Sequence, residues 1–99
     1  MTPQEKLEEI EGWPDYGVNA LGQVYSFKRK IWLKQYKNLQ GYFRVNLRSG
    51  IKRKQWPINS LVLETFIGPR PQGFEAAHLN GNKTDNRLEK RSSLQFQSL

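Results

Sequence analysis

The segment YFRVNLRSGIKRKQWPINSLVLETF, residues 42–66, changes its periodicity in the middle. Apolar residues occupy positions 43, 45 and 47, and polar or basic residues occupy positions 44, 46 and 48. Alternation with a period of two is typical of a half-buried β-strand. Ser49 and Gly50 then supply turn residues before a second, strongly basic run. We therefore expect a β-hairpin in the first half of this segment.

The register of the hairpin decides which basic side chains share a face. A two-residue turn would pair Arg48 with Ile51 and put Arg53 beside Asn46, on the face that carries Arg48. A bulge would bring Lys52 and Lys54 to that face instead. Both registers predict a hairpin with one cationic face.

After Trp56 the spacing of the apolar residues lengthens. Positions 58, 61, 62, 65 and 66 follow the i, i+3, i+4, i+7, i+8 pattern of a short amphipathic helix. Pro57 suits the start of such a helix, and Gly68 and Pro69 are expected to end it. We expect this helix to pack on the sheet through its apolar stripe.

The flanking segments predict further short elements. Residues 16–19 and 23–27 have the composition of two strands joined by a tight turn, and residues 74–77 form a candidate strand that leads to His78. The first ten residues are expected to form at most a turn or two of helix, because isolated helices of that length are marginal. The fold class is therefore α+β, with short antiparallel hairpins and one packed amphipathic helix.

Charge is distributed unevenly along the chain. The formal net charge is +7 and the isoelectric point is near 9.9, yet no acidic residue occurs between Asp15 and Glu64. A block of this kind is suited to a polyanion, most commonly nucleic acid. The candidate DNA-binding residues within it are Lys28, Arg29, Lys30, Arg44, Arg48, Lys52, Arg53 and Lys54.

The chain contains no cysteine, which excludes disulfides and thiolate zinc sites and suits a reducing compartment. No apolar run approaches the length of about 20 residues that a membrane span needs, and the amino end is acidic where a signal peptide would be basic. We expect a cytoplasmic protein, in a bacterial or phage-infected cell, and we favour a monomer.

His78 is the chain's single histidine, and it stands where the candidate strand meets a loop rich in Asn, Gly and Asp. Residues of these types form tight turns, and Asn86 is expected to begin a return strand. An imidazole that faces an Asn across such a loop can have its ring orientation fixed by the amide. A neutral imidazole can then take a proton from water near pH 7, while a divalent cation offsets charge on a phosphate.

The order of these motifs resembles a known family. LVLETFIGPRP at 61–71, followed by HLNGNKTDNRLE at 78–89, looks like the HNH endonucleases of the homing and phage-encoded type. IEGWPDYGVNALGQVYS at 10–26 resembles the small DNA-binding module that often precedes this nuclease core, and residues 41–62 resemble its connecting hairpin and helix. The resemblance divides the chain into an acidic segment at 1–9, a DNA-binding module at 10–33, an HNH-type core at 34–89 and a divergent tail at 90–99.

The resemblance implies a role for each matching residue. His78 matches the general base, and Asn86 matches the Asn that braces the two strands of the ββα-metal hairpin. The implied activity is hydrolysis of phosphodiester bonds in double-stranded DNA, assisted by Mg²⁺ or another divalent cation, with 5′-phosphate and 3′-hydroxyl products. The basic hairpins would hold the duplex.

Three positions depart from the family pattern. Ala77 stands where many members carry a metal ligand, and alanine cannot coordinate a cation. Asn59 replaces a histidine that is frequent before the helix, and KRSSLQFQSL at 90–99 stands where the family has Asn-Leu-x-Trp and a metal-binding helix. The metal ligands are therefore not assigned, although Asn80 and Asp85 are oxygen donors in the loop.

Two alternatives remain open on the sequence. The chain can be a remnant that binds DNA without cutting it, because the segment at 90–99 replaces the metal-binding helix of the family and Ala77 removes one further expected ligand. It can also be a basic RNA-binding protein, in which aromatic residues between the lysines and arginines stack on bases. The candidates for stacking are Trp32, Tyr36, Tyr42 and Phe43, although the alternation of Phe43 with Val45 and Leu47 favours core packing.

Overall fold

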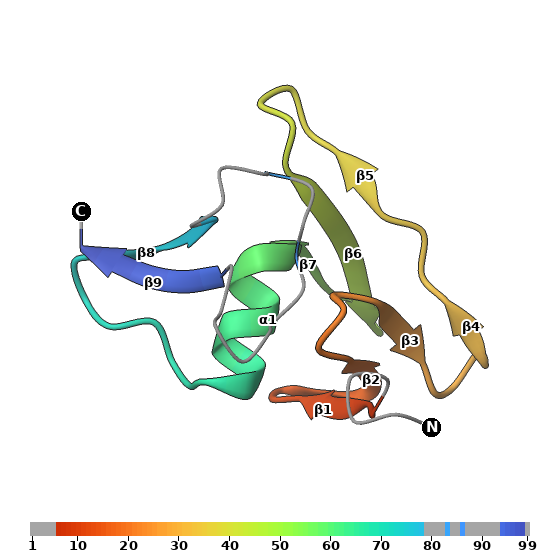
Figure 1. Ribbon diagram of the computed structural model, residues 1–99. Helices are drawn as coiled ribbons and strands as arrows, with labels where there is room; N and C mark the ends of the chain where they lie inside the picture. Colours follow the sequence, from red (N-terminus) through yellow and green to blue (C-terminus); the bar gives the residue numbers. More distant parts are fainter. Residues whose placement is uncertain (1–5, 79–82, 84–85, 87–93, 99) are drawn as a thin grey trace.

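The computed structural model describes residues 6–78, 83, 86 and 94–98. Within these residues the chain forms three antiparallel sheets and one helix, α1 (Figure 1). The first sheet contains β1 (Glu8–Ile10), β2 (Trp13–Val18), β3 (Val24–Ser26) and β4 (Ile31–Trp32) in that order. The second contains β5 (Tyr36–Lys37), β6 (Phe43–Ser49) and β7 (Lys52–Pro57), and the third contains β8 (Phe74–His78) and β9 (Leu94–Ser98). The predicted antiparallel hairpins with one helix are confirmed.

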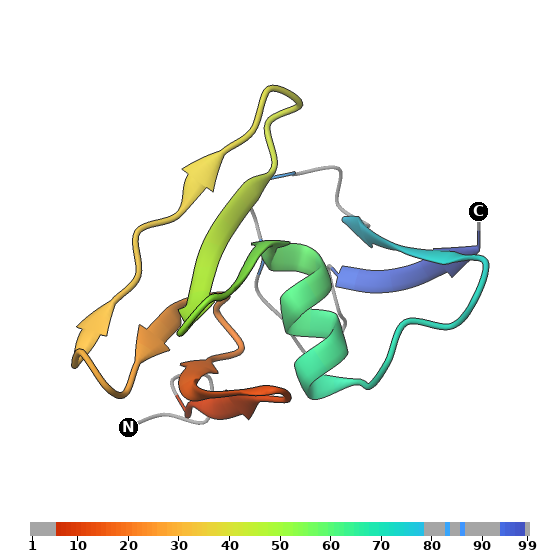
Figure 2. The ribbon, with the colours of Figure 1, turned by 180° about the vertical axis from the view of Figure 1, so that it is seen from behind.

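Helix α1 (Ile58–Phe66) lies at the centre of the molecule and contacts strands of all three sheets. Figure 2 shows it between the β8–β9 hairpin and the long β6–β7 hairpin. Its buried face consists of Ile58, Leu61, Val62 and Leu63, each 1% exposed or less. Three of the five positions of the predicted stripe, 58, 61 and 62, are therefore in the core, whereas Thr65 and Phe66 are half-buried and Leu63 is buried outside the predicted stripe.

The β6–β7 hairpin pairs Ser49 with Lys52 and Arg48 with Arg53. Its turn is Gly50–Ile51, and Gly50 has a φ of +63°, which suits the first central residue of a tight hairpin turn. The predicted pairing of Arg48 with Ile51 is therefore wrong by two residues. A register shift of two residues leaves every side chain on the same face of the hairpin, because side chains alternate with a period of two. Arg53 therefore still shares a face with Arg48, as in a hairpin without a bulge.

The amino end corrects another expectation. Glu8–Ile10 forms the edge strand β1, which pairs with β2, so the expected turn of helix is wrong over these residues. The first sheet is then joined to the second through Tyr16. Its hydroxyl donates to the backbone oxygen of Arg48 at 2.9 Å and accepts from the backbone nitrogen of Arg48 at 3.1 Å.

The carboxyl-terminal segment supplies a strand. Leu94–Ser98 forms β9, which pairs with β8 so that His78 lies opposite Leu94. Leu94 is 1% exposed and Phe96 packs against the core. The return strand therefore lies within the segment that the resemblance set apart as a divergent tail, and Asn86 precedes it rather than beginning it. No helix within the described ranges is long and apolar enough to cross a membrane.

Candidate functional site

His78 is the last residue of β8, and its side chain meets Asn86. The Nε2 atom of His78 lies 2.8 Å from Oδ1 of Asn86. An amide oxygen only accepts hydrogen bonds, so this contact is made when Nε2 carries the proton. In the neutral ring Nδ1 then keeps its lone pair, and the Asn86 contact leaves that atom free to accept a proton from another group.

Asn86 is itself held by a turn far away in the sequence. It is 6% exposed, and its Cβ and backbone oxygen would lie 2.9 and 3.0 Å from a Cβ added at Gly22. Gly22 has a φ of +83° and ends a turn in which the Oδ1 of buried Asn19 accepts from the backbone nitrogens of Leu21 and Gln23. The turn between β2 and β3 thus forms the surface on which Asn86 rests.

The loop between β5 and β6 covers another side of the imidazole. The rings of Tyr42 and His78 lie 5.7 Å apart, centroid to centroid, with a tilt of 30°. Lys83 lies near the Tyr42 ring, with Nζ 5.1 Å from the ring centroid. The same Nζ donates to the backbone oxygen of Gln40 at 3.0 Å. Tyr42 therefore packs against the candidate base.

The described residues do not fit a divalent cation well. Ala77 offers no donor, and no group of three His, Asp or Glu side chains gathers within the described part of the chain. The Oδ1 of Asn86 is already engaged by His78. Asn80 and Asp85, the oxygen donors expected in the loop, lie outside the described residues.

The predicted DNA-binding residues separate into two groups. Arg44, Arg48 and Arg53 lie on one face of the β6–β7 hairpin, because strand partners share a face. Lys28 and Arg29 join Arg48 around a hollow between β3 and the hairpin turn, which one carboxylate, Asp15, also lines. Lys30 is exposed beside them. We group these side chains under one name, the arginine face, defined as Lys28, Arg29, Lys30, Arg44, Arg48 and Arg53.

The remaining two lysines point elsewhere. Lys52 lies with Nζ 4.3 Å from the ring centroid of Trp13 and donates to the backbone oxygen of Gly12. Lys54 lies with Nζ 3.8 Å from the Trp56 ring centroid. Both belong to the hairpin face that carries buried Val45 and Leu47, opposite Arg48 and Arg53. Lys54 also lines a hollow along the hairpin together with these two arginines.

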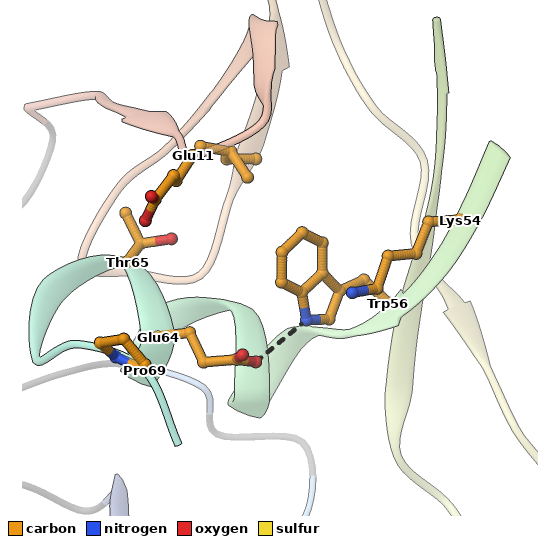
Figure 3. A pocket seen from close by; sticks show the side chains of 7 residues that line it. Glu11, Lys54, Trp56, Glu64, Thr65 and Pro69 are labelled. Atoms are coloured by element: carbon orange, nitrogen blue, oxygen red, sulfur yellow. Dashed lines mark hydrogen bonds between the residues drawn. The ribbon is translucent and has the colours of Figure 1, made fainter. Parts of the chain in front are cut away.

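Figure 3 shows the hollow into which Lys54 faces. Two carboxylates, Glu11 and Glu64, line it, and Trp56 donates from Nε1 to Glu64 Oε2 at 3.2 Å. Two negative charges make this hollow a poor place for a polyanion. The hollow is also separate from His78, because no residue of β8 lines it.

Of the residues considered for base stacking, Trp32 and Tyr36 are about half exposed, at 52% and 49%. Phe43 packs against the core, which agrees with the alternation seen in the sequence. The sequence did not reveal Gly22 as a contact of Asn86, although an Asn three residues before a Gly is a recognisable turn signal.

The chain is similar to known nucleases in sequence. It is 34% identical over 80 residues to the DNA endonuclease I-HmuI of Bacillus phage SP01, a match that covers 80% of this chain and 46% of that protein. It is 27% identical over 84 residues to an uncharacterized HNH endonuclease of Acanthamoeba polyphaga mimivirus, over 84% of this chain and 21% of that protein. No family model matches the chain.

The fold is similar as well. A solved structure of the HNH homing endonuclease I-HmuI, determined to describe DNA binding and cleavage, is similar to this chain with a TM-score of 0.82 and 32% sequence identity. The match covers 94% of this chain and 52% of the I-HmuI chain. The chain thus spans about half the length of this solved relative and less than half of the curated phage relative. Sequence and fold together relate the chain to the HNH endonucleases of the homing and phage-encoded type.

Proposed function

We propose that the chain is an HNH-type DNA endonuclease that hydrolyses phosphodiester bonds of duplex DNA with His78 as the general base. The observation that carries the proposal is the 2.8 Å contact between His78 Nε2 and Asn86 Oδ1, which orients an imidazole at a strand end beside a basic surface. The match to a DNA-cleaving relative supports it. In this proposal the segment from His78 to Asn86 corresponds to part of the ββα-metal hairpin of the family.

The chemistry assigned to His78 is one proton transfer, which accompanies displacement at phosphorus. His78 Nδ1 takes a proton from a water molecule, and the water oxygen forms a bond to phosphorus as the bond from phosphorus to the 3′ oxygen breaks. The 3′ oxygen leaves with a proton from solvent. The products are a 5′-phosphate and a 3′-hydroxyl, and Asn86 keeps the imidazole in the orientation that this transfer needs.

We propose a divalent cation, Mg²⁺ or a related ion, as the cofactor. When bound, such an ion offsets negative charge at the phosphate. The support comes from the family resemblance, since the described residues do not form a cation site of their own. We also propose that the protein acts in the cytoplasm of a bacterial or phage-infected cell, as a monomer.

The arginine face is proposed to grip the DNA backbone. Arg53 lies on this face and adjacent Lys54 lies on the other, which gives a matched pair of variants. Arg53→Gln is expected to weaken duplex binding similarly for all sequences and to reduce the slope of log affinity against log salt by about 0.9, the value for one lost phosphate contact. Lys54→Gln is expected to leave the slope unchanged. Titrations by fluorescence anisotropy between low and physiological salt measure both slopes, and equal changes in the two variants would contradict the assignment.

A second candidate function follows from Ala77. Loss of a ligand at this position favours a DNA-binding protein that no longer cuts. Incubation of the purified chain with supercoiled plasmid, in Mg²⁺ or Mn²⁺ and in EDTA, separates the two. Relaxed or linear plasmid that forms only with the cation supports the nuclease, and a mobility shift without cleavage supports the remnant. Tighter binding to single-stranded RNA than to duplex DNA would oppose both.

A further inference from the structure

We infer that a hollow beside His78, lined by Arg44 and Arg70, binds the DNA phosphate that neighbours the one under attack. The inference rests on the proposed nuclease function. The hollow has a volume of about 290 Å³ and lies where β6, the start of α1 and β8 meet. Two of its lining residues adjoin the candidate base: Ala76 is two residues before His78 on β8, and the Tyr42 ring lies 5.7 Å from the imidazole.

Arg44 forms no ion pair with a carboxylate within the described part of the chain. Its Nη1 donates to Gln55 Oε1 at 2.8 Å, a neutral acceptor that fixes the direction of the guanidinium. Its Nε is buried and no described protein atom accepts its hydrogen. A partly buried cation with an unmet donor favours an anionic acceptor, and phosphate oxygens accept from guanidinium groups in a two-pronged geometry.

Arg70 brings a second cation to the same hollow from the loop that follows α1. Within the described ranges neither Arg44 nor Arg70 forms an ion pair with a carboxylate. Asn38 and Asn59 add neutral amides to the lining, and Glu75 adds one exposed carboxylate. The hollow therefore carries two positive charges and one negative charge, a balance that favours binding of an anion. The carboxylate of Glu75 is expected to repel that anion.

The position of the hollow matches the track of a DNA strand. Arg44 and Arg48 lie four residues apart on β6, which is about 13 Å at the usual rise of a strand. Successive phosphates of one DNA strand advance about 3.4 Å along the helix axis. One strand laid along β6 can therefore place a phosphate at the Arg44–Arg70 hollow and another at the hollow formed by Lys28, Arg29 and Arg48.

The test compares duplex binding by Arg44→Gln, Arg70→Gln, the double variant and Glu75→Gln. Because both arginines are assigned to one phosphate, each single variant is expected to lose about tenfold in affinity, and the double variant little more than the worse single one. Glu75→Gln is expected to bind DNA a few-fold more tightly, since it removes the opposing charge. That gain cannot arise from misfolding. Fully additive losses, no losses, or an unchanged affinity for Glu75→Gln would overturn the inference.

The location beside the attacked phosphate is tested by cleavage rates at saturating protein, where binding defects no longer limit the rate. The double variant is expected to cut at least tenfold more slowly than wild type, whereas Lys6→Gln, which removes an exposed cation beside Glu8 outside the proposed DNA-binding surface, is expected to cut at the wild-type rate. Equal rates in the two would overturn the location. A wild-type chain that makes no cut refutes the proposed function, while the binding measurements still decide whether the hollow holds a phosphate.

Discussion

Replacement of His78 with alanine is expected to slow DNA cleavage by about 10²- to 10⁴-fold, the range that a positioned general base contributes. No other histidine exists in the chain to substitute for it. DNA affinity is expected to change less than about twofold, because His78 is neither a lysine nor an arginine and is assigned no phosphate contact. Single-turnover rates with protein in excess, on a duplex that wild type cuts, measure the loss directly.

Asn86→Ala serves as the companion to this variant. It leaves the imidazole in place but removes the acceptor for Nε2, so the ring can rotate and its protonated nitrogen is no longer fixed. We expect a rate between those of wild type and His78→Ala. Cleavage at the wild-type rate by His78→Ala would show that another group is the base.

Substitution of Gly22 with alanine is expected to have the second-largest effect. The added Cβ would lie 2.9 Å from Asn86 Cβ, 3.0 Å from the Asn86 backbone oxygen and 3.2 Å from Ile58 Cγ2. Backbone atoms and buried core atoms cannot move far to relieve such short contacts, so we expect Asn86 to be displaced. The φ of +83° adds backbone strain of about 1 kcal/mol or more. We expect lower unfolding free energy and a cleavage rate reduced toward that of Asn86→Ala.

Gly73→Ala is the matched control. Gly73 has a φ of +81°, and a Cβ there would meet nothing within 4 Å. It therefore carries the same backbone cost as Gly22→Ala without the contact at Asn86. Urea unfolding and single-turnover cleavage of both variants separate strain from displacement. If Gly73→Ala loses as much cleavage activity as Gly22→Ala, the contact with Asn86 does not position the site.

The elements that the sequence predicted well are those set by local pattern. The β6–β7 hairpin and α1 follow from periods of two and 3.6 over residues 42–66, and both are present. The register was missed because the turn is decided by which residue takes positive φ. The sequence allows the two-residue turn to be Ser49–Gly50 or Gly50–Ile51, because Gly50 can take either central position. The folded hairpin has Gly50 in the first central position.

Elements set by long-range pairing were not predictable in this way. Glu8–Ile10 has the acidic composition of a helix start. It is a strand because its backbone pairs with the edge of β2. Leu94–Ser98 is a strand because β8 lies beside it and because Leu94 is buried in the common core. In both cases tertiary contacts outweigh local propensity.

The candidate site shows the same division. The sequence pointed to His78 and Asn86 through a motif in which they are close along the chain, and the structure brings them within 2.8 Å. It could not point to the approach of Gly22 to Asn86, or to the hollow that Arg44 and Arg70 both line, because these residues come from different sheets and loops. Folding also separated Lys52 and Lys54 from the arginines beside them in sequence, since adjacent strand residues face opposite ways.

The central claim is that this chain hydrolyses DNA by water attack that releases the 3′ oxygen, and the ends of its product test that claim most directly. Supercoiled plasmid is cut by wild-type protein with Mg²⁺ or Mn²⁺, and the nicked product is treated with DNA ligase. The proposed chemistry predicts 5′-phosphate and 3′-hydroxyl ends, which ligase reseals without prior treatment. Nicks that ligase reseals only after their ends are repaired, or plasmid that stays uncut, would contradict the account.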